Sequence, residues 1–287
     1  MRKHSQLFLT NTLAVLAVIR CLAAAPPSST GTVRFNVRIE DLPAALAPQQ
    51  AIIQAHIVTA ARLWTDLVET KACEIQIVFG IRDVVDGDPK KLGYGKSRRS
   101  VSFGQTRQGD KSVAEQGWAS LLRTGRHPQV GEPDVEIGFQ SAYVIREFWW
   151  DPDPIARTMP VPRGKLDALS VILHELGHAM AFNGWIDPDT GKPRGRYLST
   201  YDRWVQWDGR DFHFCGPEAV RICGKPILLA HSVNNYHHLG EERADVPIDP
   251  VLRNDLMTGY HFQWAKRYSI TPLDAAILQD CGIQRKR

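Results

Sequence analysis

The residues best suited to chemistry are His174, Glu175 and His178, which form the five-residue pattern His-Glu-Leu-Gly-His. Residues four apart lie on the same face of a helix, so both imidazoles can reach one metal ion. Zn²⁺ accepts imidazole nitrogen as a ligand, and Glu175 is placed to take a proton from a water at that metal. The pattern therefore predicts a catalytic zinc site with His174 and His178 as two ligands and Glu175 as the general base.

The sequence around this pattern predicts a helix with one buried face. The Pro160–Gly164 segment marks its start, and Asn183-Gly184 offers a left-handed end after the last apolar position. A core helix whose histidines only form hydrogen bonds is the alternative, but a glutamate buried beside two histidines needs a partner, which a metal supplies. The apolar positions at helical spacing are Leu166, Leu169, Ile172, Leu173, Leu176 and Met180.

The first 25 residues have the pattern of an export signal. Arg2 and Lys3 form a basic start, the apolar run Leu7–Leu22 follows, and small residues at Ala23–Ala25 suit cleavage. The run is too short and too broken to span a membrane. We therefore expect a secreted protein, extracellular or periplasmic, with residues 1–25 removed and no membrane anchor.

The charge of the chain excludes one class of partner. The formal net charge is +4, and it falls to about +1 once Arg2, Lys3 and Arg20 leave with the signal segment, which contains no acidic residue. Nucleic-acid binding requires a strong basic surface, so no nucleic-acid partner is expected.

An even number of cysteines remains after the signal segment, which favours disulfides in an exported chain. These cysteines are Cys73, Cys215, Cys223 and Cys281, and three pairings are possible. The natural local pair is Cys215 with Cys223, which leaves Cys73 with Cys281 as a staple between early and late parts of the fold.

Periodicity predicts an α+β fold with a small sheet and two long helices. Pro48–Leu67 carries apolar residues at helical spacing, and Glu74–Phe79 alternates as a half-buried strand does. Arg99–Phe103 and Asp134–Phe139 indicate further strands. We expect an N-terminal lobe over residues 26–184 and an irregular C-terminal lobe over residues 185–287. The latter ends in a helix that Thr271, Pro272 and Asp274 begin and Gly282 closes.

Catalytic zinc normally takes three protein ligands and leaves one position for water. In the compact metzincin pattern, a glycine stands three residues after the second histidine and the third ligand stands six residues after it. Here those positions hold Ala181 and Gly184. The third ligand must therefore come from later in the chain.

The later chain offers His237-His238-Leu-Gly240, followed by Asp255-Leu-Met257-Thr-Gly259. With the zinc helix, these segments resemble leishmanolysin-like metzincins, in which an insertion separates the second zinc histidine from the third. Further similar segments are Asp134–Ser141, Phe214–Val220 and Ile270–Gly282, so the resemblance touches the chain from about Asp134 to Gly282. It implies a metzincin-like fold, with Met257 in a turn beneath the zinc and not a ligand.

The resemblance favours His238 as the third ligand, because in the relatives the ligand directly precedes a Leu-Gly type of pair. His237 is the second candidate, and His231 and His213 are weaker ones. Ala181 departs from the family's glycine, so we expect Asn183-Gly184 to turn the chain out of the helix about one turn later.

The leading interpretation is a secreted zinc metalloendopeptidase that acts on protein or peptide substrates and is a monomer. Its metal ligands would be His174, His178 and His238. One alternative is a zinc hydrolase whose third ligand is acidic, for instance Glu241 or Glu242. Another is a secreted protein that binds the metal without turnover, which the retained Glu175 argues against.

Overall fold

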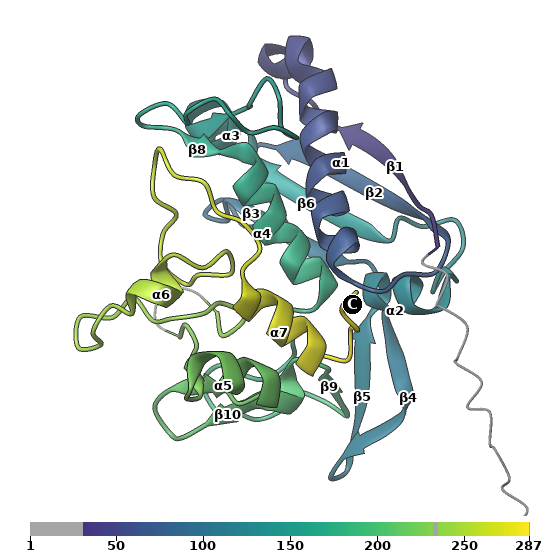
Figure 1. Ribbon diagram of the computed structural model, residues 1–287, viewed down its shortest axis with the longest axis vertical. Helices are drawn as coiled ribbons and strands as arrows, with labels where there is room; N and C mark the ends of the chain where they lie inside the picture. The colour runs from purple at the N-terminus through teal and green to yellow at the C-terminus, as the bar shows by residue number, and fades with distance from the viewer. Residues whose placement is uncertain (1–30, 232–234, 287) are drawn as a thin grey trace, which may run out of the picture.

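The computed structural model describes residues 31–231 and 235–286, and in this range the chain has a mixed α+β fold, as predicted (Figure 1). The expected export signal, residues 1–25, lies outside the described residues. None of the described helices is long and apolar enough to cross a membrane.

A four-stranded sheet forms the upper part of the molecule, in the order β1-β2-β6-β3 (Figure 1). The first three strands, β1 (Val33–Glu40), β2 (Cys73–Arg82) and β6 (Val135–Gln140), are parallel. Strand β3 (Gly93–Ser97) pairs antiparallel with β6 and forms one edge. The predicted strands Glu74–Phe79 and Asp134–Phe139 are confirmed as β2 and β6.

Two long helices lie side by side across one face of this sheet (Figure 1). Helix α1 (Gln50–Leu67) confirms the predicted amphipathic helix, and α4 (Ala168–Met180) carries the His-Glu-Leu-Gly-His pattern. The indole nitrogen of Trp64 on α1 donates a hydrogen bond of 2.9 Å to the Leu173 carbonyl on α4. Helix α4 also packs closely on β3, so the edge strand lies beside the predicted catalytic residues.

A second sheet, in the order β4-β5-β9, lies below the first (Figure 1). Its strands are β4 (Ser100–Gln108), β5 (Lys111–Gln116) and β9 (Tyr197–Ser199). The strand predicted at Arg99–Phe103 is confirmed as the start of β4. Between these strands the chain forms α2 (Gly117–Thr124), α3 (Ser141–Glu147), β7 (Phe148–Trp149) and β8 (Leu166–Asp167).

The C-terminal part contains short elements and long connections, as its irregular sequence predicted. Its last helix, α7, begins with the predicted capping box, in which Thr271 and Asp274 each bind the other's backbone N–H. The elements here are η2 (Asp202–Trp204), β10 (Val205–Trp207), β11 (Phe212–Phe214), α5 (Pro217–Cys223), β12 (Ile227–Leu228), α6 (Pro250–Arg253) and α7 (Pro272–Asp280), while η1 (Ala44–Gln49) precedes α1.

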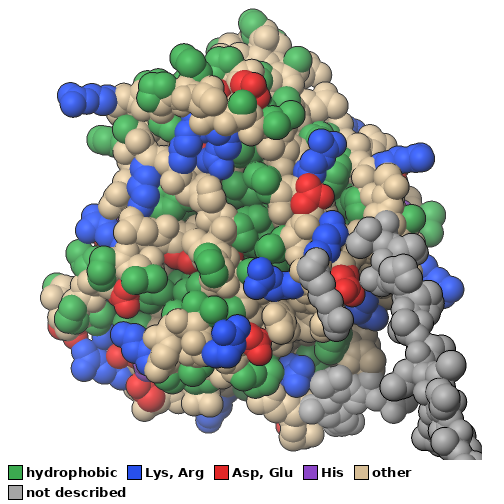
Figure 2. Space-filling model, viewed as in Figure 1, with side chains coloured by type: hydrophobic (Ala, Val, Ile, Leu, Met, Phe, Trp, Pro, Cys, Tyr) green, Lys and Arg blue, Asp and Glu red, His purple; other side chains and the backbone are tan. Residues whose placement is uncertain are grey.

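One hydrophobic cluster joins the segments on both sides of residue 184. Trp64 and Leu173 belong to it from the first part, and Tyr201, Met257 and Ile277 from the second. The two predicted lobes therefore share a core. On the face shown in Figure 2, Lys and Arg side chains are scattered among acidic, apolar and other groups.

The predicted disulfides are wrong for this structure, since Cys73, Cys215, Cys223 and Cys281 are all free. Between Cys215 and Cys223 the chain forms helix α5 (Pro217–Cys223), which advances about 1.5 Å per residue and so spans about 9 Å. A disulfide needs Cα atoms within about 7 Å of each other. Cys73 begins β2, and Cys281 is buried at the end of α7.

Candidate metal centre

Asp167 fixes the start of the helix that carries the site. Its carboxylate accepts hydrogen bonds from the Ser170 backbone N–H (3.1 Å) and hydroxyl (2.6 Å), which caps helix α4. The guanidinium of Arg157 lies 2.7 Å from the same buried carboxylate. Nearly every residue of α4 is buried, including Glu175 and His178, so the helix is held on all sides.

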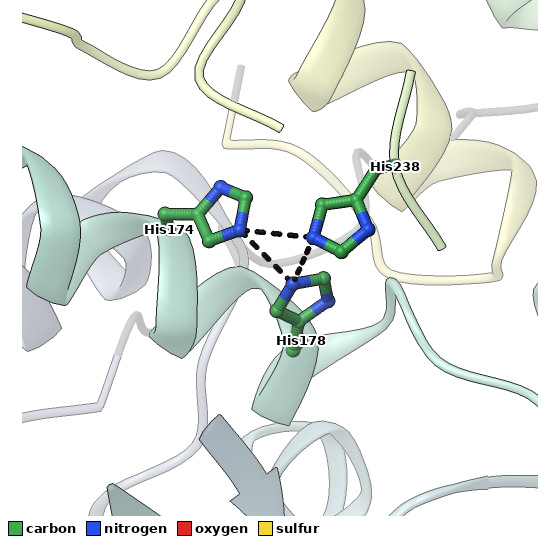
Figure 3. Close-up of side chains that lie close together, drawn as sticks. All are labelled: His174, His178 and His238. Carbon is green, nitrogen blue, oxygen red and sulfur yellow. Dashed lines mark hydrogen bonds between the residues drawn. The ribbon is translucent and has the colours of Figure 1, made fainter. Parts of the chain in front are cut away.

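The structure brings His174, His178 and His238 together, and their side chains point at one another (Figure 3). The Nε2 atom of His178 lies 3.1 Å from those of His174 and His238, and these two Nε2 atoms are 3.2 Å apart. Two of the imidazoles come from consecutive turns of α4, and the third comes from a segment sixty residues later in the chain.

The opposite nitrogen of each imidazole faces a backbone carbonyl. The Nδ1 atoms of His174, His178 and His238 lie 2.8, 2.8 and 3.2 Å from the carbonyl oxygens of Leu256, Phe182 and Asn235. A carbonyl can only accept, so Nδ1 carries the hydrogen and Nε2 carries a lone pair. Burial lowers the pKa of His174 to about 4, which keeps its imidazole neutral. Three lone pairs then converge on one point, an arrangement that a cation stabilises.

The donor set fits Zn²⁺. With Zn–N bonds of about 2.0–2.1 Å, a tetrahedral site places its nitrogens about 3.3–3.4 Å apart, close to the observed separations. Neutral imidazoles whose Nδ1–H groups are held by carbonyls are the usual zinc donors. Three such ligands leave a fourth position open.

Backbone hydrogen bonds to neighbouring segments place His238, and not His237, in the triangle. The His238 carbonyl accepts a hydrogen bond of 3.0 Å from the Ala230 N–H, and the next residue, Leu239, donates to the Met257 carbonyl at 2.8 Å. His237 instead uses its Nε2 to accept the backbone N–H of Gly184 at 2.9 Å. It therefore supports the chain just past α4 and does not join the triangle.

Glu175 lies on α4 against the edge strand β3. A Cβ added at Gly93 would lie 3.2 Å from the Glu175 Oε1, and the Gly95 N–H donates to the same carboxylate. Burial raises the pKa of Glu175 to about 8, against the opposing positive charge of Lys91. The negative charge of Glu175 reaches Tyr143, whose pKa is raised by burial first and by that charge second.

Met257 packs directly against helix α4. An added Cβ at Gly177 would lie 2.5 Å from the Met257 Sδ. The preceding residues hold this turn in place: the Asp255 carboxylate accepts the Met257 N–H at 2.9 Å, and the Leu256 carbonyl orients His174. The turn that contains Met257 thus supports a member of the triangle without contributing a ligand.

The remaining sequence candidates lie outside the triangle. The Glu241 carboxylate accepts the His231 N–H at 2.7 Å, and Glu242 lies 2.9 Å from the exposed imidazole of His261. His213 lies on β11, 3.9 Å from an Asp208 carboxylate oxygen. No observation on the described residues favours an acidic third ligand.

The predicted left-handed end at Asn183-Gly184 is wrong. Helix α4 ends at Met180, and neither Asn183 nor Gly184 has positive φ. A glycine is needed at position 184 for another reason, since an added Cβ there would lie 1.9 Å from the Asp202 Oδ1. Close approach of a buried carboxylate, and not backbone handedness, explains this residue.

Sequence reasoning missed the groups that contact Glu175 and the Met257 turn. Gly93, Gly95 and Tyr143 approach Glu175, and Asp255 joins the Met257 turn to α7 through Thr271. A glycine at alternate positions of a short strand is a weak signal for close packing. The role of Asp255 depends on a contact with a residue sixteen positions later, which no local pattern indicates.

A scan against protein-family models and a search of curated proteins each found no match for this chain. Its function is therefore inferred from the site itself.

Proposed function

We propose that this protein is a zinc-dependent endopeptidase of the metzincin type, with His174, His178 and His238 as the zinc ligands. The observation that carries the proposal is the triangle of imidazole lone pairs, two of them from the helix on which Glu175 directly follows His174 and the third from a single returning segment. A binding protein needs the imidazoles but has no use for a carboxylate in this position.

In this proposal the three imidazoles hold the metal and Glu175 transfers the proton. Zn²⁺ on the three imidazoles would polarise the scissile carbonyl and a water molecule. Glu175 accepts the proton of the attacking water and then delivers it to the leaving amine. Burial raises the pKa of Glu175 to about 8, and the positive charge of a Zn²⁺ held by the imidazoles would lower it, which would leave the carboxylate ionised to accept a proton near neutral pH.

The open edge of the main sheet provides a place for an extended peptide. The Gln140 N–H donates to the Leu92 carbonyl, and the Arg98 N–H donates to the Asp134 carbonyl. Pairing alternates along an antiparallel strand, so Gly93 and Gly95 direct their backbone groups away from β6. The Gly95 N–H already donates to Glu175, so an added strand would pair with the other outward-facing backbone groups of this edge. Because Gly93 and Gly95 also contact Glu175, such a peptide would pass the proposed site.

We also propose that the protein is exported. The support is the basic, apolar and small-residue sequence of residues 1–25. N-terminal sequencing of the protein from the culture medium or periplasm tests this, and an intact residue 1 in a retained protein would contradict it.

The test of the activity combines metal analysis with one conservative variant. We expect one zinc per purified chain and cleavage of a casein-type substrate that stops in a chelator. Glu175→Gln should retain the zinc and lose roughly two to four orders of magnitude in kcat, because it removes the base and leaves the imidazoles in place.

Glu218→Gln is the matched control, since Glu218 lies on α5 and its side chain pairs with Arg221. It should cleave at the wild-type rate. A metal-free protein with full activity, or a Glu175→Gln variant with wild-type activity, contradicts the proposal.

A further inference from the structure

A cavity of about 470 Å³ lies where β4, β5 and the segment before β9 meet. Ser100, Ser102 and Ala114 line it from the two strands, and Trp185 and the segment Arg194–Tyr197 complete its wall. Two basic and two aromatic side chains therefore surround one hollow, and none of its lining residues is acidic.

Two segments that line this cavity follow closely, along the chain, segments that contact Glu175 or the histidine next to His238. Strand β3, whose glycines contact Glu175, ends at Ser97, and β4 begins three residues later at Ser100. On the other side, Trp185 directly follows Gly184, whose N–H binds His237 next to the ligand His238. We therefore expect a chain lying along the outer edge of β3 to reach the cavity beyond the Ser97 end of that strand.

Backbone hydrogen bonds hold the basic wall in position. The Arg194 N–H donates to the Trp185 carbonyl at 3.0 Å, and the Arg196 carbonyl accepts the Ser112 N–H at 3.0 Å. Arg196 thus joins β5 through its main chain, and its exposed side chain is not needed for that contact.

The two guanidinium groups differ in their partners. Arg194 lies 3.4 Å from the Asp187 carboxylate, which offsets part of its charge. Within residues 31–231 and 235–286, the structure gives no ion pair to Arg196. The ring of Tyr197 is half exposed beside it, and aromatic faces favour the flat, apolar part of a peptide side chain.

We propose that this cavity is a substrate subsite that binds an acidic side chain of an extended peptide, with Arg196 as the group that recognises the carboxylate. The proposal rests on the endopeptidase function proposed above and names a preference that the metal centre alone does not give. Guanidinium binds carboxylate through two parallel hydrogen bonds, and Arg196 offers this on the path of the bound chain.

The test separates binding from turnover by using zinc-loaded Glu175→Gln protein. The probes are fluorescent ten-residue peptides in which one Asp, Glu, Ala or Lys is moved through each position. We expect one position at which Asp or Glu binds roughly five- to tenfold more tightly than Ala. Arg196→Glu in the same protein should remove this preference and favour Lys at that position.

Arg62→Glu is the matched control, because Arg62 is exposed on α1 and does not line the cavity. It should keep the acidic preference. The subsite is disproved if no position favours an acid, if Arg196→Glu keeps the preference, or if Arg62→Glu loses it equally. If the acidic preference depends on Arg196 but the wild-type protein cleaves none of the peptides, the subsite stands and the endopeptidase proposal fails.

Discussion

Gly177 and Met257 lie so close together that position 177 has no room for a side chain. A Cβ on Gly177 would be 2.5 Å from the Met257 Sδ and 3.2 Å from the Trp64 Cζ2. Met257 is completely buried, so it can move aside only by displacing its neighbours. The helix that carries His174 and His178 therefore rests directly on the turn whose Leu256 carbonyl orients His174.

Gly177→Ala should destabilise the zinc-loaded protein by about 1–2 kcal/mol. Forcing a methyl group into a full core costs roughly 1–3 kcal/mol, and the better helix propensity of alanine offsets at most about 1 kcal/mol. Urea unfolding measures the change. Met257→Ala in the same chain should remove the overlap. The double variant should therefore lose less free energy of unfolding than the two single variants lose in total.

Gly195→Ala is the control for this pair, because its Cβ would meet nothing within 4 Å. It should change the stability by less than about 0.5 kcal/mol. Equal effects of the two glycine substitutions would show that the contact between Gly177 and Met257 is not tight.

The turn that contains Met257 is also tied to the last helix by two buried carboxyl groups. Asp255 accepts the Met257 N–H and, at 2.6 Å, the Thr271 hydroxyl, while Asp274 accepts the Thr271 N–H. The buried Oδ1 of Asp274 has no hydrogen-bond partner among the described residues, and the charge of Asp255 acts on this carboxyl group. A proton shared between the two carboxyl groups satisfies both. Burial and the neighbouring charge of Asp255 raise the pKa of Asp274 well above its ordinary value.

Asp274→Asn should make the stability less dependent on pH. The folded wild-type protein holds a proton that the unfolded chain releases above the ordinary value of 3.8, so the wild type loses stability as the pH rises. An Asn amide donates the same hydrogen bond without titrating. The variant should therefore gain on the wild type above pH 4, by at most about 1.4 kcal/mol per pH unit.

Urea unfolding at pH 4, 6 and 8 checks this sign. The exposed Asp66 on α1 provides the control, and Asp66→Asn should show no such gain with pH. A wild type that gains stability over Asp274→Asn as the pH rises would mean that the two carboxyl groups do not share a proton.

The sequence predicts the parts of this fold that depend on local periodicity. Alternation in Glu74–Phe79 and helical spacing in Pro48–Leu67 each place apolar side chains on one face, and burial then produces β2 and α1. The same reasoning places His174 and His178 on one helical face. Because these two histidines are four residues apart, a helix alone is enough to bring them to the same face.

The features that the sequence did not predict correctly depend on contacts between residues far apart in the chain. His237 and His238 are adjacent and chemically identical, and their roles differ through long-range contacts: His237 accepts the Gly184 N–H, whereas the His238 Nε2 meets those of His174 and His178. Gly184 resembles a helix stop in sequence, yet its small size serves Asp202, which approaches from eighteen residues later. The predicted disulfide between Cys215 and Cys223 is wrong because the number of cysteines gives no information about the helix that forms between them.

Substitution of the adjacent histidines should separate these roles. His238→Ala should abolish stoichiometric zinc binding, because only two of the converging lone pairs remain. His237→Ala should keep the zinc and cost about 1–3 kcal/mol of stability, since it leaves the Gly184 N–H without its acceptor. Elemental analysis after dialysis gives the zinc content, and urea unfolding gives the stability.

The exposed His261 is the control for removing an imidazole, and His261→Ala should change neither quantity by much. Zinc retained by His238→Ala and lost by His237→Ala would move the third ligand by one residue. Zinc retained by both variants would return the acidic residues Glu241 and Glu242 to consideration.

The four described cysteines are free in the structure, whereas their number in an exported chain predicted disulfides. All four cysteines from Cys73 onward are free, so the denatured protein without residues 1–25 should react with four equivalents of a thiol reagent before any reduction. A reductant should leave the melting temperature unchanged. A disulfide between Cys73 and Cys281 would close most of the chain into a loop, and reducing it would cost about 4–5 kcal/mol in the chain-entropy model.

In the native protein the buried Cys281 should react more slowly than the half-buried Cys73 and Cys215. A marked fall in melting temperature on reduction, with no thiols detected beforehand, would show that the isolated protein carries disulfides that this structure lacks.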